Sequence, residues 1–262
     1  MQFLYYFFLF IFGLIIGSFL NALVWRMYHG RSMLGYSECP LCHHRLPPAD
    51  LVPIFSFIFL KARCRYCRRP ISWQYPLVEF TAALAFTVIG YRNIAGAATG
   101  ADLWILELLF LCALASVCLG IFVFDWKYYL IPDSLVLSGV ILAAIYRLIF
   151  NREYFLDGLW GAGLLAGFFG FLYLVSAGRW IGLGDAKLGV FLGLLLGFKL
   201  SLVMLMIAYI SGALVGVTLI LAKRKTLKGI LPFGTFLTFS AFIVFLWGEQ
   251  LLDWYLRSVL NL

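Results

Sequence analysis

The sequence predicts an all-α, polytopic membrane protein with about eight transmembrane helices and a zinc-ribbon-like cytosolic loop after the first helix. Of its 262 residues, 64% are hydrophobic and only 12% are charged, whereas about a quarter of the residues in soluble domains are charged. A mean hydropathy of +0.99 gives the same indication. The only long polar segment, about 27–75, contains four of the 6 cysteines, so it is the candidate for a folded module outside the membrane.

Each apolar run can cross a hydrocarbon core of about 30 Å at about 1.5 Å per residue, and the shorter runs do so with tilt or local thinning. The predicted spans are residues 3–25, 76–91, 103–124, 133–150, 157–178, 186–198, 200–222 and 231–251. The first run has no positive residue ahead of it and is longer than the core of a signal peptide. We therefore expect it to be a retained helix.

Lysine and arginine predict the orientation, because cytosolic loops near a membrane carry an excess of them. With the first loop in the cytosol, fifteen of the 20 lysines and arginines lie inside and five outside. This arrangement predicts that both termini lie outside and that Asp125 and Asp185 lie at cytosolic helix ends. The net charge of +8 then reflects topology and contact with anionic membrane lipid. No surface rich in basic and aromatic residues indicates a nucleic-acid partner.

Two C-x₂-C pairs in the first loop, separated by 21 residues, have a spacing typical of tetrahedral zinc sites. The predicted ligands are Cys39, Cys42, Cys64 and Cys67. A reducing cytosol favours a metal over disulfides, and four protein ligands indicate a structural Zn²⁺. The alternatives are four reduced thiols or, with inverted topology, two oxidisable pairs. His43 and His44 could replace a cysteine ligand, although solvated loop positions suit them better.

The candidate catalytic residues are two aspartates in apolar surroundings, Asp125 and Asp185. An ionisable group at membrane depth costs roughly 2.5–3.5 kcal/mol and is a functional-site candidate by default. All three histidines lie in the first loop, and the chain has neither H-E-x-x-H nor G-x-S-x-G. The chain therefore lacks the catalytic histidine that a serine protease would need in the membrane, and it lacks the ligand motif of metalloproteases.

Two neighbouring carboxyl groups in a low-dielectric site do not both ionise easily, so they share a proton. The ionised group can then take a proton from water while the other donates to the scissile carbonyl oxygen, which predicts an intramembrane aspartic protease. The sequence leaves open which of the two aspartates is protonated. It also leaves simpler interpretations: Asp185 as the N-cap of the span from 186, and Asp125 as a solvated residue at a helix C-terminus.

Four further residues are predicted to support the pair. Gly182 and Gly184 are expected to allow unusual backbone conformations and the close approach of a peptide substrate. Lys187 is expected to anchor its helix at the membrane interface. Asp133 directly follows Pro132, and we expect it to cap the span that begins there.

These motifs, in this order, resemble those of the type IV prepilin peptidases, which are G-x-G-D membrane aspartic proteases. The resemblance extends over almost the whole chain. It is carried by residues 17–21 with Arg26, the two cysteine pairs, 50–53, 56–57, 63–67, 71–72, 75–79, 124–125, 131–133 and 182–187. It implies that Asp125 and Asp185 are catalytic, within a fold shared with presenilin-like enzymes.

The resemblance also implies the reaction and its setting. Family members cleave the leader of type IV prepilins or pseudopilins after a glycine, at the cytosolic face of the bacterial inner membrane. They also methylate the new N-terminus with S-adenosylmethionine, and no residue here is assigned to that donor. Residues 1–102, with two helices and the cysteine loop of about 27–75, are expected to form the methyltransferase part. Residues 103–262 are expected to form a six-helix peptidase core.

Two other functions remain open at this point. A proton-coupled transporter would also carry carboxylates in the membrane, although usually near the midplane and with internal repeats. A zinc-bearing assembly factor without enzymatic activity would use both aspartates only as helix caps.

Overall fold

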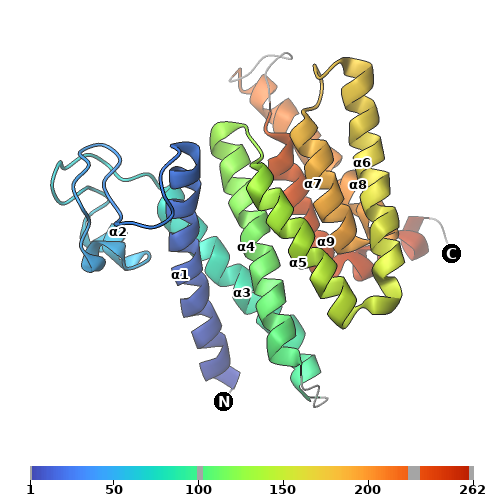
Figure 1. Cartoon of the computed structure of the whole chain (residues 1–262), viewed down its shortest axis with the longest axis horizontal. Coiled ribbons are helices and arrows are strands. Elements are labelled where there is room, and N and C mark those ends of the chain that lie inside the picture. Colours follow the sequence, from blue (N-terminus) through green and yellow to red (C-terminus); the bar gives the residue numbers. More distant parts are fainter. Residues whose placement is uncertain (1, 99–102, 224–230, 260–262) are drawn as a thin grey trace. The chain divides into compact units, whose positions relative to one another are not determined.

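The computed structural model describes residues 2–98, 103–223 and 231–259, and their regular structure is helical (Figure 1). The elements are α1 (Gln2–Tyr28), η1 (Pro48–Leu51), α2 (Phe55–Phe59), α3 (Gln74–Ala98), α4 (Trp104–Tyr128), α5 (Asp133–Phe150), η2 (Arg152–Tyr154), α6 (Phe155–Ser176), α7 (Leu183–Leu196), α8 (Phe198–Leu221) and α9 (Phe233–Val259). Within these ranges, extended pairing is limited to two isolated bridges. The predicted all-α class is confirmed.

All eight predicted spans fall on helices, namely α1 and α3 to α9. Six described helices are long and apolar enough to cross a membrane: α1, α4, α5, α6 with the preceding η2, α8 and α9. Helix α7 has only 14 residues, or about 21 Å at 1.5 Å per residue. The chain is therefore a multi-pass membrane protein, while the count of eight stays a prediction.

The chain divides into two compact units, Met1–Gly120 and Ile121–Leu262, so that α4 contributes to both. The domain boundary expected after residue 102 adjoins residues 99–102, which lie outside the described residues. The assignment of methyl transfer to the first part and of peptidase activity to the second also stays a prediction.

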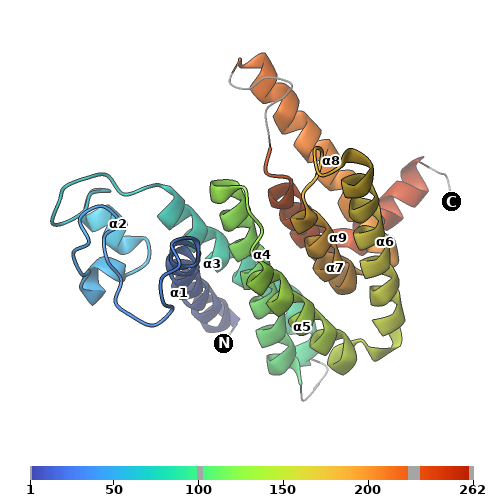
Figure 2. The ribbon, with the colours of Figure 1, turned by 45° about the horizontal axis from the view of Figure 1, so that its top comes forward.

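In the first unit, α1 and α3 pack side by side (Figures 1 and 2). A Cβ atom added at Gly13 would lie 2.5 Å from the Cα of Ala83, so the two backbones meet where only glycine fits. Such close approach of backbones at small residues is a common way for helices to associate in membranes.

The cysteine loop is attached to this helix pair by polar contacts. Arg26 on α1 donates its guanidinium to the carbonyl oxygen of Gly35 in the loop at 2.9 Å. The backbone N–H of Ile54 donates to the buried Glu79 carboxylate on α3 at 2.7 Å. A carboxylate inside a helix pair is costly unless it is hydrogen-bonded, so the loop and the helices stabilise each other.

In the second unit, α7 contacts α5, α6, α8 and α9 (Figure 2). Leu188, Phe191 and Leu192 on α7 are completely buried. A Cβ at Gly161 of α6 would lie 2.5 Å from the carbonyl oxygen of Gly193 of α7, so these two helices touch at glycines. A helix that is apolar on all sides is a buried helix, and α7 is the central one of this unit.

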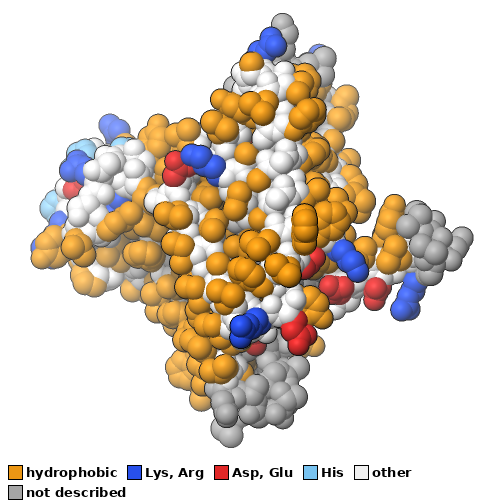
Figure 3. Space-filling view, turned by 45° about the vertical axis from the view of Figure 1, so that its right-hand side comes forward, with side chains coloured by type: hydrophobic (Ala, Val, Ile, Leu, Met, Phe, Trp, Pro, Cys, Tyr) orange, Lys and Arg blue, Asp and Glu red, His pale blue; other side chains and the backbone are white. Residues whose placement is uncertain are grey.

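The helix surfaces are largely apolar (Figure 3). Trp160 and Leu174 on α6 are 71% and 77% exposed, and Leu214 on α8 is 63% exposed. Exposed apolar surface of this extent suits hydrocarbon, in which the helices satisfy their own backbone hydrogen bonds.

Candidate active site and metal centre

Asp125 lies in the last turn of α4 and is 4% exposed. Its Oδ2 atom accepts two hydrogen bonds from Thr235 in the first turn of α9. The backbone N–H donates at 2.7 Å and the side-chain hydroxyl at 3.0 Å. Both contacts are buried and come from one residue, so α9 holds this carboxylate in a fixed orientation.

Asp185 lies in the first turn of α7 and is 8% exposed. Its Oδ2 accepts the backbone N–H of Gly182 at 3.3 Å. Gly182 is the N-cap of α7, which begins at Leu183, so the interpretation of Asp185 as the N-cap itself is wrong. Its carboxylate instead satisfies one of the backbone donors that a helix start leaves free.

Asp125 and Asp185 lie at helix ends that share a neighbouring residue. The side chain of Ile131, in the connection between α4 and α5, packs against the starts of both α7 and α9. A Cβ added at Gly184 would lie 3.2 Å from the Cβ of Ile131, and one at Gly234 would lie 2.8 Å from its Cδ1. Two buried acids from different helices therefore lie at helix starts and ends that pack on one residue, Ile131.

The two predicted glycines differ in their role. Gly184 sits in contact with Ile131 of the same chain, and the close approach of a peptide substrate stays a prediction. Gly182 has φ −81°, which any residue adopts, and an added Cβ would meet nothing within 3.7 Å, the nearest atom being at 3.8 Å. The expected unusual backbone conformation is therefore not present at Gly182.

Lys187 and Asp133 form an ion pair between the starts of α7 and α5. The Nζ of Lys187 donates to both carboxylate oxygens, at 2.8 and 2.9 Å. The two side chains are 51% and 72% exposed. Pro132 is the N-cap of α5 and Asp133 makes no capping hydrogen bond, so the predicted capping role is wrong. Its carboxylate is directed to Lys187 instead.

Sequence reasoning missed two residues of this bundle. Thr235 contacts Asp125 directly, and the available signal was Pro232 followed by Gly234 at the start of an apolar run. Arg147 on α5 lies at the opposite end of α7, where it donates to the carbonyl oxygens of Leu194 and Leu195, both at 2.9 Å. The Arg147 side chain is 8% exposed, so a buried arginine caps the C-terminal end of the central helix.

The four loop cysteines form a second candidate site. The four Sγ atoms all lie within 4.8 Å of one another, and none is in a disulfide; they belong to Cys39, Cys42, Cys64 and Cys67. Four thiolates about 2.3 Å from a central zinc ion would lie about 3.8 Å apart in a tetrahedron. The Sγ atoms of Cys39 and Cys67 are 4.0 Å apart, so the cluster fits a metal ion of this kind.

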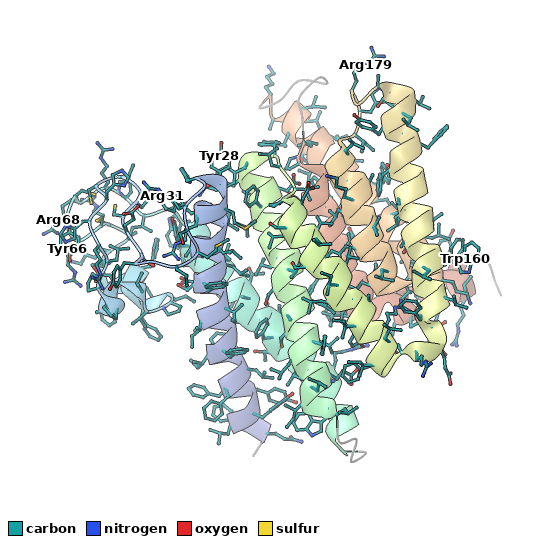
Figure 4. The ribbon with its side chains drawn as sticks, in the orientation of Figure 1. Tyr28, Arg31, Tyr66, Arg68, Trp160 and Arg179 are labelled. Carbon is teal, nitrogen blue, oxygen red and sulfur yellow. The ribbon has the colours of Figure 1, made fainter. Side chains whose placement is uncertain are left out.

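The two cysteine pairs have the same backbone geometry. Cys39 accepts the N–H of His43 and donates its own N–H to His44. Cys64 makes the same two bonds with Arg68 and Arg69. Both turns have positive φ at the fifth residue, 56° at His43 and 59° at Arg68. Tyr66 and Arg68 mark the second turn in Figure 4.

Local contacts act differently on the thiols of this cluster. Backbone hydrogen bonds, first from Cys67 and then from Tyr66, lower the pKa of the Cys64 thiol to about 7 against the effect of burial, whereas the pKa of the Cys42 thiol is raised to about 11. A thiolate is the form that binds metal. The two histidines have other partners: His44 stacks on Tyr66, and His43 faces Glu38 at 3.8 Å.

A bidentate ion pair fixes the second cysteine turn to η1. Arg65 donates to Asp50 from Nε at 3.1 and 3.0 Å and from Nη2 at 2.6 Å. The Asp50 side chain is only 2% exposed. Such paired hydrogen bonds restrict orientation as well as position, which suits a small module with little apolar core.

Comparison with known proteins gives consistent matches. Residues 11–93 match the family described as bacterial peptidase A24 N-terminal domain, and residues 112–217 match the type IV leader peptidase family. A prepilin leader peptidase/N-methyltransferase of Bacillus subtilis (strain 168) is 33% identical over 259 residues, covering 97% of this chain and 98% of the relative. No solved structure matches the chain.

Two further relatives carry the same name. The protein of Aeromonas salmonicida (strain A449) is 30% identical over 289 residues, covering 98% of this chain and 96% of its own. The protein of Pseudomonas putida is 30% identical over 274 residues, covering 91% of this chain and 89% of the relative. With relatives of this similarity matched from end to end, the chain belongs to the type IV leader peptidase family.

Proposed function

We propose that this protein is a membrane aspartic endopeptidase that removes the leader of type IV prepilins or pseudopilins after a glycine, and that it methylates the new N-terminus. The observation that carries the peptidase activity is the buried pair of Asp125 and Asp185, on different helices of one unit. The near full-length relatives named prepilin leader peptidase/N-methyltransferase support both activities.

The proposed hydrolysis uses the pair around one water molecule. One aspartate takes a proton from the water as its oxygen attacks the scissile carbonyl carbon, and the other donates a proton to the carbonyl oxygen. Burial at 4% and 8% exposure keeps bulk water away and strengthens both interactions. Gly184 lies in contact with Ile131 next to Asp185, where the absence of a side chain lets the α4–α5 connection approach the start of α7 closely.

We propose that the site lies at the cytosolic face of the bacterial inner membrane, with both chain termini outside. The excess of lysine and arginine on one side of the membrane supports this orientation. Lys127, Arg179 and Lys187 lie near the ends of the helices that carry the aspartates, and all three are exposed. A prepilin held with its basic leader inside would present its cleavage site at this depth.

We propose that the metal of the cysteine loop is zinc with a structural role. Cys39, Cys42, Cys64 and Cys67 would hold it, and four thiolates leave no open position for a reacting water. Bound zinc would supply free energy of folding to a loop that has little apolar core.

We propose S-adenosylmethionine as the methyl donor, on the family resemblance. In the described part of the chain no strand is present, so the glycine-rich strand-to-helix turn of soluble nucleotide sites is absent there. We assign no residue to the donor. The first unit, with the cysteine loop docked on α1 and α3, is the proposed seat of methyl transfer.

The peptidase is tested with Asp125→Asn and Asp185→Asn in the purified full chain, with a prepilin as substrate and the shortened product detected by mass spectrometry. Each variant should lose cleavage by at least about 10³-fold, because either change removes one half of the acid–base pair. The matched control is Asp253→Asn, an exposed aspartate on α9. A folded Asp125→Asn or Asp185→Asn protein that processes prepilin fully would refute the assignment.

Methyl transfer is tested separately by supplying S-adenosylmethionine with a labelled methyl group and a prepilin already cleaved. The Asp125→Asn variant should still label the N-terminus of this pre-cut substrate, because its first unit is unchanged. If the unmodified enzyme failed to label the pre-cut substrate, the proposed methyl transfer would be refuted and only the peptidase activity would remain.

A further inference from the structure

The two catalytic candidates are hydrogen-bonded unequally. Asp125 receives two donors on one oxygen, at 2.7 and 3.0 Å, both from Thr235 and both buried. Asp185 receives one backbone donor, from Gly182, at 3.3 Å. The Asp125 contacts are in the range of strong charge-assisted hydrogen bonds, whereas the Asp185 contact is long for an N–H donor.

This inequality decides where a shared proton resides. Donors aimed at a carboxylate stabilise its charged form, and two short bonds do so more than one long bond. The helix dipoles act in the opposite direction, since Asp125 ends α4 and Asp185 begins α7. The effect of a helix dipole on a charge is smaller than that of two charge-assisted hydrogen bonds. The N-terminus of α9 is also positive and lies at Asp125, so it offsets the negative C-terminus of α4.

Other charged groups do not reverse this order. The titratable groups of the adjoining helix ends are Lys127 on α4, Asp133 on α5, Arg179 after α6 and Lys187 on α7, and α8 contributes Tyr209. Lys187 is directed to Asp133, and Arg179 donates to the carbonyl oxygen of Ser176. Tyr209 packs on Phe233 at the start of α9, with ring centroids 5.1 Å apart, and a neutral phenol adds no positive charge there.

We infer that Asp125 is the ionised aspartate, that Asp185 carries the shared proton, and that Thr235 is the positioning residue that fixes this division. The inference rests on the proposed peptidase function. Asp125 then takes a proton from water as the water oxygen bonds to the carbonyl carbon, and Asp185 gives its proton to the carbonyl oxygen. The tetrahedral intermediate then carries two hydroxyl groups. When its C–N bond breaks, the leaving nitrogen takes the proton from Asp125, and one of the hydroxyl groups gives its proton to Asp185.

The assignment is tested by two peptide probes with the leader sequence of a prepilin, applied to the full chain in detergent. An epoxide probe esterifies an ionised carboxylate, because the carboxylate oxygen opens the ring. A diazo probe esterifies a protonated carboxyl group, which gives up its proton as nitrogen gas leaves. We expect the epoxide on Asp125 and the diazo product on Asp185, located by mass spectrometry of the digested protein. The reverse pattern would overturn the inference.

The role of Thr235 is tested by a hydroxyl series. Thr235→Val keeps the shape and the backbone N–H but removes the hydroxyl, so kcat should fall about tenfold and KM should change little. The acid limb of the kcat/KM profile should move to higher pH by about one unit, because the Asp125 anion loses one donor. Thr235→Ser should restore the original profile.

The matched control is Thr238→Val, which removes a buried hydroxyl one turn further along α9 that bonds only within its own helix. Its pH profile should be unchanged. An unmoved acid limb in Thr235→Val would overturn the positioning role, since a merely structural defect lowers the folded fraction at every pH. Full cleavage by Asp125→Asn, with neither aspartate labelled, would instead overturn the proposed function itself.

Discussion

Gly234 shows how closely the residues around the aspartate pair are packed. A Cβ at this position would lie 2.8 Å from the Cδ1 of Ile131 and 3.0 Å from the Oδ2 of Asp125. Neither atom can move freely, because Ile131 also touches Gly184 and Oδ2 is bonded to Thr235. A single added methyl group would therefore displace the candidate catalytic carboxylate.

We predict that Gly234→Ala lowers kcat for prepilin cleavage by about 10²-fold, the loss expected for a misplacement of about 1 Å. The matched control is Gly212→Ala on α8, where an added Cβ would make ordinary contacts with Phe236 at 3.7 Å. The measurement is cleavage by the two purified proteins at equal folded concentration. Normal activity of Gly234→Ala would mean that Asp125 need not hold this position.

The ion pair of Lys187 and Asp133 should matter much less. Both side chains are more than half exposed, and such pairs are worth about 0–1 kcal/mol. We predict that Lys187→Gln and Asp133→Asn each leave cleavage within about threefold of the unmodified protein, a change of under 1 kcal/mol. Steady-state cleavage kinetics at two salt concentrations measure this effect. A loss of activity as large as that of Asp185→Asn would show that the Lys187–Asp133 ion pair takes part in catalysis.

At the scale of elements, α7 needs support at both ends because it is shorter than the membrane is thick. Its N-terminal end lies at the candidate active site and its C-terminal end is closed by Arg147. Gly197 follows with φ +86°, and an added Cβ there would collide with Asp157, whose carboxylate accepts the N–H of Phe198. The arginine thus satisfies carbonyl groups that would otherwise be orphaned within the bundle.

We predict that Arg147→Met lowers the free energy of unfolding by about 2–5 kcal/mol, because two buried carbonyl groups lose their donor. Unfolding of the purified protein by titration with SDS in mixed micelles measures this. The control is Arg152→Met, at an exposed arginine of η2. Equal stability of the two variants would show that water or another group satisfies these carbonyls. In Figure 4, Trp160 lies in the N-terminal part of α6, the neighbour of α7, and Arg179 follows the C-terminal end of α6.

At the scale of the whole molecule, the two compact units predict two separable activities. The cysteine cluster belongs to the first unit, and both aspartates belong to the second. Loss of the metal should therefore unfold the loop without disturbing the aspartate pair.

We predict that Cys64→Ser loses bound zinc, exposes the loop to trypsin at Arg68, and lowers methyl transfer by about tenfold or more while cleavage changes less. Elemental analysis of the purified chain, limited proteolysis and the two activity assays measure these effects. Cys112→Ser, at a buried cysteine of α4, is the control and should retain the metal. Equal loss of both activities in Cys64→Ser would contradict the separation.

Much of the fold was predictable because its signals are local. Every predicted span falls on a helix, since the length of an apolar run is itself the condition for crossing a membrane. The cysteine ligands were predictable from spacing, and the structure confirms that their four sulfur atoms gather. The family was predictable from motif order, and the relatives confirm it. The catalytic roles of Asp125 and Asp185 stay predictions.

By itself, the sequence determined the class of the protein, the positions of its helices and the residues whose charge or sulfur demands an explanation, because these follow from composition and short spacings. Only the tertiary structure decided which distant groups meet. Thr235 reaches Asp125, Asp133 pairs with Lys187, and Arg147 closes α7. The physical reason is that such contacts depend on how helices pack and turn about their axes, and no local pattern of residues specifies that packing.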